Sequence, residues 1–301
     1  MEIGIVGLGR MGKNMASRLL ENEELNVYVQ NRTFSKAKQL EKKGAKAFKT
    51  IKDLVNAFSG RKLIWLMLPS GNVTETTFQK LLKLLNKNDI IIEGANSNFH
   101  DTLKRHKQAK KAGIKMLDVG VSGGILAADR GYPLMIGGEK NTYNYAKPIF
   151  KQLSNPGAYG RVGGPGRGHY VKMIHNAIEY GMMQSIAEGF QLLKDGRFND
   201  VDLKKTATIF NNGCIIDGLL MEMVKNRYDK DVELKELKPY VSDSGEGRWA
   251  AKEAIDQGVP FLANTFAVHS RFTSQDEQSY AFKLLAAIRN EFGGHAVKKD
   301  D

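Results

Sequence analysis

The sequence has one cysteine among its 301 residues and no long apolar run. A single Cys214 excludes an intramolecular disulfide framework and any Cys-x-x-Cys metal or redox motif, so it indicates a reducing compartment. No stretch approaches the roughly 18 apolar residues that a membrane-spanning helix requires. The first residues, Met-Glu-Ile-Gly-Ile-Val-Gly, lack the basic and long apolar regions of a signal peptide. We therefore expect a cytoplasmic protein.

The composition is that of a globular protein with an excess of positive charge. Hydrophobic residues make up 42% and charged residues 26%, which excludes a disordered chain and a membrane bundle. At roughly 150 residues per domain, the length predicts two domains. The net charge of +12 favours anionic partners. Because no helix-turn-helix, zinc-finger or aromatic-basic signature is present, a phosphorylated metabolite explains this charge as well as nucleic acid does, and much of it can be solvated surface.

Two kinds of pattern divide the chain. Before about residue 160, short apolar runs alternate with helical stretches, which predicts a mostly parallel sheet with helices on both faces. The runs are 3–6, 25–29, 63–68, 90–92, 116–119 and 134–136. The glycine- and proline-rich segment 155–168 marks a boundary, and helical periodicity follows over 165–194, 200–227, 247–257 and 262–291. We expect domains at 1–162 and 163–301, the second all-helical and serving substrate binding and oligomerisation.

A glycine motif follows the first predicted strand directly. Gly7-Leu8-Gly9-Arg10-Met11-Gly12 is Gly-x-Gly-x-x-Gly at the start of an amphipathic helix. Such glycines permit a tight turn, backbone approach to a pyrophosphate and close helix packing. The alternative is a simple tight turn. The position in a βαβ unit favours an α/β fold whose N-terminal domain is a Rossmann dinucleotide-binding domain, followed by a mainly α-helical C-terminal domain.

The end of the second predicted strand indicates which cofactor is bound. An NAD-binding strand ends in an acidic residue, but this strand ends in Asn31-Arg32-Thr33. A guanidinium suits a 2′-phosphate, so we predict NADP, with NAD as the alternative. The other interpretation is that Arg32 only begins a surface helix.

Polar residues line one face of the long helix after the boundary. Lys172, Asn176 and Glu179 stand at i, i+4 and i+7, with His175 beside them, so at about 100° per residue they share a stripe. A lysine and a carboxyl near apolar walls can serve as general base and acid. The alternative is a solvated stripe with an ordinary charge pair.

Two strand ends carry further candidates. Asn96 follows one predicted strand, and Ser122, Gly123 and Gly124 follow another, so all lie at the carboxyl edge of the sheet, where ligands bind. Either segment could instead be a routine strand-to-helix turn with a capping side chain.

The strings GLGRMG, GANS, DVGVSGG and GHYVKMIHNAIEYG, in this order, resemble the 6-phosphogluconate dehydrogenases of the β-hydroxyacid dehydrogenase superfamily. The resemblance runs nearly end to end, and VKMIHNAIEYG is its most discriminating part. It implies oxidative decarboxylation of 6-phosphogluconate to ribulose 5-phosphate and CO2 with reduction of NAD(P), a reaction of the pentose phosphate pathway and of gluconate utilisation. It implies no metal.

The resemblance also implies residue roles. Lys172 resembles the base that takes the C3 hydroxyl proton, and Glu179 the acid that protonates C1 after CO2 departs. The other matching positions are substrate contacts, namely Asn96, Ser122, Gly123, Gly124, His175, Asn176, Tyr180, Arg248, Arg271, Arg289 and His295. Cofactor contacts fall on Gly7, Gly9, Arg10, Met11, Gly12, Asn31, Arg32, Thr33 and Asn96.

The C-terminal segment carries a further expectation. Arg289-Asn-Glu-Phe-Gly-Gly-His295 resembles the family tail that enters the neighbouring subunit's active site, which implies a homo-oligomer, dimer or tetramer. The alternative is a frayed terminus. The chain resembles the short form of the family. It departs from the family pattern at Arg248, where a lysine is usual, and at Asp217, where we expect arginine.

Two rival functions stay open. One is a non-decarboxylating 3-hydroxyacid dehydrogenase acting on a small unphosphorylated acid, which the four basic residues Arg248, Arg271, Arg289 and His295 argue against. The other is a non-catalytic Rossmann binding module, which the presence of both Lys172 and Glu179 argues against.

Overall fold

The structure is a computed structural model, and it describes residues 1–293 and 296–298. Its contacts divide the chain into two compact units, Met1–Asn176 and Ala177–Asp301. The division falls inside one continuous helix, α8 (Arg167–Asp195), whose first turns belong to the first unit. The expected domain boundary after residue 162 stays a prediction.

The first unit is an eight-stranded sheet in the order β3-β2-β1-β4-β5-β6-β7-β8. All neighbouring strands are parallel except β6 and β7. The strands are β1 (Glu2–Val6), β2 (Asn26–Gln30), β3 (Lys46–Phe48), β4 (Leu63–Leu66), β5 (Ile90–Glu93), β6 (Lys115–Val121), β7 (Leu134–Gly138) and β8 (Tyr159–Gly163). Strand order reverses between β1 and β4, the point at which such sheets bind ligands.

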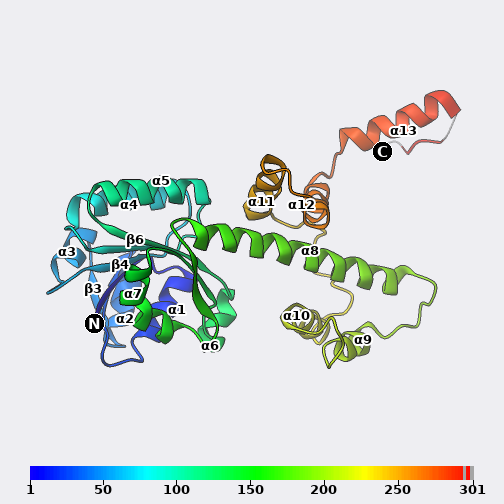
Figure 1. The fold of residues 1–301 in the computed structure, drawn as a ribbon. Coiled ribbons are helices and arrows are strands. Elements are labelled where there is room, and N and C mark those ends of the chain that lie inside the picture. The colour runs from blue at the N-terminus through cyan, green and yellow to red at the C-terminus, as the bar shows by residue number, and fades with distance from the viewer. Residues whose placement is uncertain (294–295, 299–301) are drawn as a thin grey trace. The chain divides into compact units, whose positions relative to one another are not determined.

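Helices cover both faces of this sheet, as the unbroken apolar strands predict (Figure 1). One core lies under α1 (Arg10–Leu19), α2 (Phe34–Glu41) and α7 (Lys140–Leu153). The other lies under α3 (Ile51–Asn56), α4 (Asn72–Leu84) and α5 (Phe99–Lys111). The 3-10 turn η1 (Gly124–Leu126) and the short α6 (Ala127–Arg130) follow β6. The predicted fold class is confirmed.

Two strands were not expected from the sequence. β3 has three residues, too few to show an alternating pattern. β8 lies within the glycine-rich segment that we interpreted as a break. It is an edge strand, paired on one side only with β7, and edge positions tolerate glycine and exposure because half of their backbone groups need no partner.

The second unit is helical in the part of the chain that the structure describes. It contains the remainder of α8, then α9 (Leu203–Phe210), α10 (Leu219–Tyr228), α11 (Glu246–Asp256), α12 (Leu262–Gln275) and α13 (Tyr280–Gly293). The expected helix 200–227 is interrupted, because Gly213 and Gly218 adopt positive φ angles of 85° and 136° between α9 and α10. The expected helix 262–291 is likewise two helices, α12 and α13.

Candidate active site

The glycine loop after β1 has the geometry that a dinucleotide requires. Gly7 has a φ of +99°, which a side chain rarely adopts, and a Cβ added to Gly12 would overlap the Gly7 carbonyl oxygen. A Cβ added to Gly9 would meet no atom within 4 Å, so the loop leaves room for a group lying against its backbone. No side chain of the described residues caps the start of α1. The helix N-terminus can therefore bind a pyrophosphate.

The end of β2 supports this loop and presents a cation beside it. Asn31 Oδ1 accepts from the Leu8 backbone N–H at 2.9 Å, so this side chain holds the loop itself. Arg32 is exposed, and its guanidinium makes no hydrogen bond or ion pair with the residues that the structure describes. Thr33 is at the N-cap of α2, without a side-chain capping bond among those residues. The Arg32 charge is thus available to a ligand.

Asn96 joins the loop after β5 to the end of β6. Its amide donates to the Val121 carbonyl oxygen at 3.0 Å and accepts from the Val121 N–H at 2.9 Å. Asn96 has a φ of +48°, which asparagine tolerates better than most residues. Much of its hydrogen-bonding capacity therefore serves the fold, leaving one amide hydrogen and one lone pair for a ligand.

Lys172 lies at the centre of a polar cluster at the carboxyl edge of the sheet. The residue is 5% exposed, and its Nζ is 3.3 Å from Ser122 Oγ and 3.4 Å from His175 Nδ1. It also donates to Asn176 Oδ1, which is 2.9 Å from His175 Nδ1. The structure thus brings together four of the predicted residues. Gly123 and Gly124, both with positive φ, form the turn that follows Ser122.

The start of α8 packs directly on the backbone of the sheet, which sequence reasoning missed. A Cβ added to Gly120 would overlap the Cβ of Lys172, and one added to Gly168 would overlap the carbonyl oxygens of Asp118 and Met135. A Cβ on Gly137 would lie 2.6 Å from both Asp118 carboxylate oxygens. One signal of this packing was available in the sequence. Alternate residues of a strand face the same side, so Gly120 leaves space on the face that also carries Ser122.

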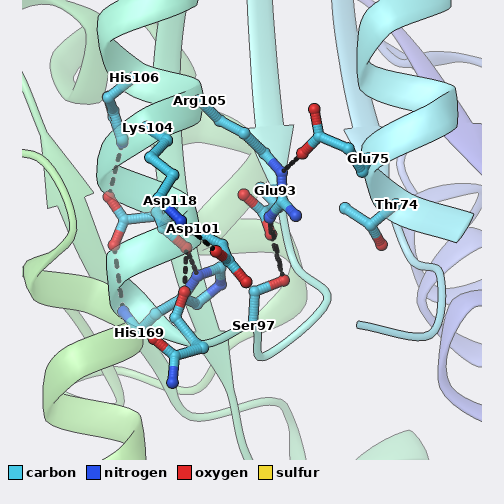
Figure 2. A network of polar contacts seen from close by, with 12 residues as sticks. Thr74, Glu75, Glu93, Ser97, Asp101, Lys104, Arg105, His106, Asp118 and His169 are labelled. Carbon is cyan, nitrogen blue, oxygen red and sulfur yellow. Dashed lines mark hydrogen bonds and ion pairs between the residues drawn. The ribbon is translucent and has the colours of Figure 1, made fainter. Parts of the chain in front are cut away.

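A buried network of charged groups joins β5 and β6 to α5 (Figure 2). Glu93 and Asp118 are register partners on β5 and β6, and both are fully buried. Successive residues of α5 reach them, with Arg105 Nη1 2.7 Å from Glu93 Oε1 and His106 Nε2 2.8 Å from Asp118 Oδ1. Arg105 Nε also pairs with Glu75 at 2.8 Å. Two carboxylates are thus buried side by side, each next to a basic side chain.

The pKa of Asp118 is displaced by these neighbours. Burial alone raises the pKa of this carboxyl, but the hydrogen bond from His106 and the charges of His169 and His106 outweigh burial and hold the pKa below its ordinary value. The pKa of Arg105 is raised: burial lowers it, and the charges of Glu93 and Glu75 more than compensate. Asp118 is therefore ionised at neutral pH.

The second unit contains a separate cluster of basic and hydroxyl groups. The Arg271 guanidinium lies 3.4 Å from the centre of the Tyr180 ring, and Tyr180 Oη is 3.0 Å from Ser244 Oγ. Arg248 Nε pairs with Asp243 at 2.6 Å, and Asp243 also accepts from the Gly245 N–H at the start of α11. Asp243, which sequence reasoning missed, holds Arg248 in place. Such a cluster can bind a phosphate.

The remaining predicted residues lie outside these two clusters. Glu179 is half-buried on α8. Arg289 is exposed on α13 and makes no hydrogen bond or ion pair with the residues described, and His295 lies outside them. Asp217 accepts from the Gly213 N–H at 3.2 Å and so belongs to the turn between α9 and α10.

Among residues 1–293 and 296–298, no three His, Cys, Asp or Glu side chains gather in a way that could hold a metal ion. No helix in that part of the chain has both the length and the apolar character needed to span a membrane.

Comparison with known proteins agrees with the sequence resemblance. The family description "NAD binding domain of 6-phosphogluconate dehydrogenase" matches residues 2–163, and "6-phosphogluconate dehydrogenase, C-terminal domain" matches residues 168–301. The NAD(+)-dependent, decarboxylating 6-phosphogluconate dehydrogenase of Haloferax volcanii is 34% identical over 306 residues, covering 100% of both chains. The prediction of a dinucleotide-binding N-terminal domain is confirmed.

Solved structures show the same fold. A 6-phosphogluconate dehydrogenase of Plasmodium falciparum, solved in its apo form, with NADP+ and with 6-phosphogluconate, aligns with a TM-score of 0.83 at 28% identity, over 100% of this chain and 66% of that one. The 3-hydroxyisobutyrate dehydrogenase of Mycobacterium tuberculosis aligns with a TM-score of 0.71 at 20% identity, over 91% of this chain and 92% of that one, and shows the shared fold alone. On these matches and the site geometry, the chain belongs to the 6-phosphogluconate dehydrogenase family.

Proposed function

We propose that the protein oxidatively decarboxylates 6-phosphogluconate to ribulose 5-phosphate and CO2, with reduction of NADP. The observation that carries this proposal is Lys172, a buried amine held by Ser122 and Asn176 at the carboxyl edge of a dinucleotide-binding sheet. An amine in this position can accept a proton from a substrate hydroxyl. Family membership supplies the substrate class.

The first chemical step needs a base next to the C3 hydroxyl. Lys172 Nζ takes this proton, while Ser122 and Asn176 fix the direction of the amine and His175 contributes a further hydrogen-bonding nitrogen. The bound nicotinamide supplies the acceptor for the hydride that leaves C3. The product of this step is a 3-keto acid, and a ketone β to a carboxylate can take up the electron pair released when CO2 leaves.

The second step needs an acid. When CO2 leaves, the proton that Lys172 took returns to the former ketone oxygen, which gives the 1,2-enediol of ribulose 5-phosphate. Glu179, two helical turns beyond Lys172 on α8, then donates a proton to C1 of this enediol, while Lys172 takes the C2 hydroxyl proton as the ketone of ribulose 5-phosphate forms. Hydrogen-bond donors around the ketone oxygen are sufficient to stabilise the enediol. Lys172 thus exchanges protons with substrate oxygens, whereas Glu179 protonates a carbon.

The cluster around Tyr180 in the second unit suits the phosphate. Arg271 and Arg248 offer two guanidinium groups, and Tyr180 and Ser244 offer hydroxyls. Arginine binds phosphate oxygens in a bidentate manner, so replacement of the usual lysine by Arg248 retains the charge and changes the geometry. An unphosphorylated acid would leave these groups without a ligand.

One assay distinguishes the proposed function from its rivals. The protein is incubated with 6-phosphogluconate and either cofactor, and reduced nicotinamide and CO2 are both measured. Equal amounts of the two products support the proposal. Reduction without CO2 would indicate a non-decarboxylating 3-hydroxyacid dehydrogenase, and no reduction would favour a non-catalytic binding module.

Cofactor preference is predicted from Arg32. We expect kcat/KM to be higher with NADP than with NAD, and Arg32→Glu to lower kcat/KM for NADP by about tenfold or more because a carboxylate repels the 2′-phosphate. Steady-state kinetics with both cofactors measures this effect. Lys42→Glu, at the exposed C-terminal end of α2, is the matched control and should leave the preference unchanged. A wild-type protein at least about tenfold more efficient with NAD, the cofactor named for the Haloferax relative, would contradict the prediction.

We also propose that the C-terminal tail serves the active site of a second copy of the chain. Tyr280, Phe282 and Leu285 on α13 are each more than half exposed, which is unusual for large apolar side chains of one helix and supports a partner surface. Deletion of residues 293–301, which removes His295 and leaves Arg289, should raise KM for 6-phosphogluconate about tenfold, the effect of losing one polar contact with the phosphate, without lowering the melting temperature. Wild-type KM for the truncated chain would contradict tail exchange.

A further inference from the structure

The first turn of α8 begins without a capping side chain of its own. The segment that leads into the helix, Gly163-Gly164-Pro165-Gly166, contains no serine, threonine, asparagine or aspartate. The first N–H groups of a helix have no partner within the helix, and leaving them buried and unpaired is costly. Gly166 and His169 are both buried here, so their N–H groups need acceptors from elsewhere in the fold.

Asp118 supplies these acceptors from the middle of β6. Its Oδ1 accepts from the Gly166 N–H at 2.8 Å, and its Oδ2 accepts from the His169 N–H at 3.0 Å. His106 Nε2 approaches Oδ1 from the other side at 2.8 Å, as Figure 2 shows. The His169 ring is held in turn, with Nδ1 2.8 Å from Thr102 Oγ1. The carboxylate is thus fixed by α5 and fixes the start of α8.

Alternate residues of β6 and the turn after it connect this anchor to the reacting amine. Asp118, Gly120 and Ser122 have the period of two that places side chains on one face of a strand. Asp118 binds the backbone of α8, Gly120 leaves space for the Lys172 Cβ, and Ser122 Oγ lies 3.3 Å from Lys172 Nζ. Residues 118–122 therefore hold the beginning of α8 at two places. Asp118 binds its backbone N–H groups, and Ser122 contacts the Lys172 side chain.

We propose that Asp118 is a positioning residue, which sets the position of Lys172 against Ser122 by accepting the N–H groups of Gly166 and His169. Asp118 does not touch the substrate in this proposal. It acts through the first turn and a half of α8, and a displacement of the amine by a fraction of an ångström is enough to slow proton transfer. The inference rests on the proposed role of Lys172 as the base.

Asp118→Asn is the variant that tests the proposal. Asparagine has the same shape but one acceptor oxygen, so in either orientation its NH2 group faces a backbone N–H of α8. We expect kcat to fall by between about tenfold and about a hundredfold, with KM for NADP within about twofold of wild type. A larger primary isotope effect with 3-deuterated 6-phosphogluconate should accompany the loss, because hydride transfer becomes more strongly rate-limiting.

A matched control lies at the amino end of a parallel strand, away from the carboxyl end where the candidate site lies. Asp89 is also buried and also accepts two backbone N–H groups, those of Lys62 at 3.0 Å and Asn86 at 2.8 Å, and it pairs with Lys62 Nζ at 3.4 Å. It directly precedes β5, at the amino end of that strand. Asp89→Asn therefore removes the same kind of acceptor, and it should reduce thermal stability while leaving kcat within about twofold of wild type.

Hydrogen exchange of the ligand-free protein gives a readout that does not depend on activity. In Asp118→Asn, the amides of residues 164–170 should exchange about tenfold faster or more, while Asp89→Asn leaves that segment unchanged.

Three results would overturn the proposal. They are wild-type kcat in Asp118→Asn, a fall in its kcat without faster exchange, and an equal fall in kcat in Asp89→Asn. If Asp118→Asn does not fold, His106→Gln takes its place with an expected fall in kcat of about threefold or more, and wild-type kcat in that variant overturns the proposal. A wild-type protein inactive on 6-phosphogluconate refutes the proposed function instead, and unchanged exchange in Asp118→Asn then refutes the anchor as well.

Discussion

Replacing Lys172 with methionine is expected to abolish turnover of 6-phosphogluconate, with kcat/KM falling by about a thousandfold or more. Methionine keeps much of the length of the buried side chain but cannot take a proton from the C3 hydroxyl. The residue lies at the centre of the cluster with Ser122, His175 and Asn176, so no other described side chain in that cluster offers an amine in its place. Reduced nicotinamide formation at saturating cofactor measures the effect.

The control for this variant is binding, which should not change. Quenching or enhancement of NADPH fluorescence should give the wild-type dissociation constant, because the glycine loop after β1 lies on other elements. Lys107→Met, at an exposed position on α5, should turn over normally. Normal turnover by Lys172→Met would refute the assignment of the base.

Replacing Glu179 with glutamine is expected to lower kcat by about a hundredfold while leaving the first hydride transfer nearly intact. Glutamine cannot protonate C1 of the enediol, so the loss falls on the steps after oxidation. Rapid mixing should show a burst of reduced nicotinamide close to the enzyme concentration, followed by a slow steady state. This pattern differs from Lys172→Met, for which no burst is expected.

Glu188→Gln is the matched control for the acid. Glu188 is an exposed carboxylate on the same helix, where it accepts from Gln184 at 2.7 Å. Its replacement should leave both the burst and the steady state at wild-type values. If Glu179→Gln slows the burst as much as the steady state, the residue does not act as an acid after oxidation.

Most of the fold was predictable because residues that are close in the sequence specify each strand and helix. A buried parallel strand is mostly apolar, and such runs stand out in the sequence at 3–6 in β1, at Leu63–Leu66 in β4 and at 90–92 in β5. β8 was hidden because an edge strand needs neither burial nor alternation. The breaks at Gly213 and Gly218 were hidden because helical spacing on both sides of a turn can continue across it by chance.

The site was predictable only where a helix or a strand end placed the residues. Lys172 and Asn176 are one turn apart on α8, so their contact follows from helix geometry. Asp118 is bonded to Gly166 and His169, which are 48 and 51 residues away, and nothing in the local pattern indicates that pairing. Asp243 was missed for the same reason, because its contact with Tyr180 spans 63 residues.

The direct seating of α8 on the backbone of β6 and β7 limits how this enzyme could acquire a new substrate. At Gly120, Gly137 and Gly168 no side chain separates the helix from the sheet, so any larger residue there would displace the start of α8, which includes Lys172, rather than reshape a pocket wall. Natural variation or directed evolution of substrate range should therefore accumulate in residues away from this junction, while the junction itself accepts almost no change.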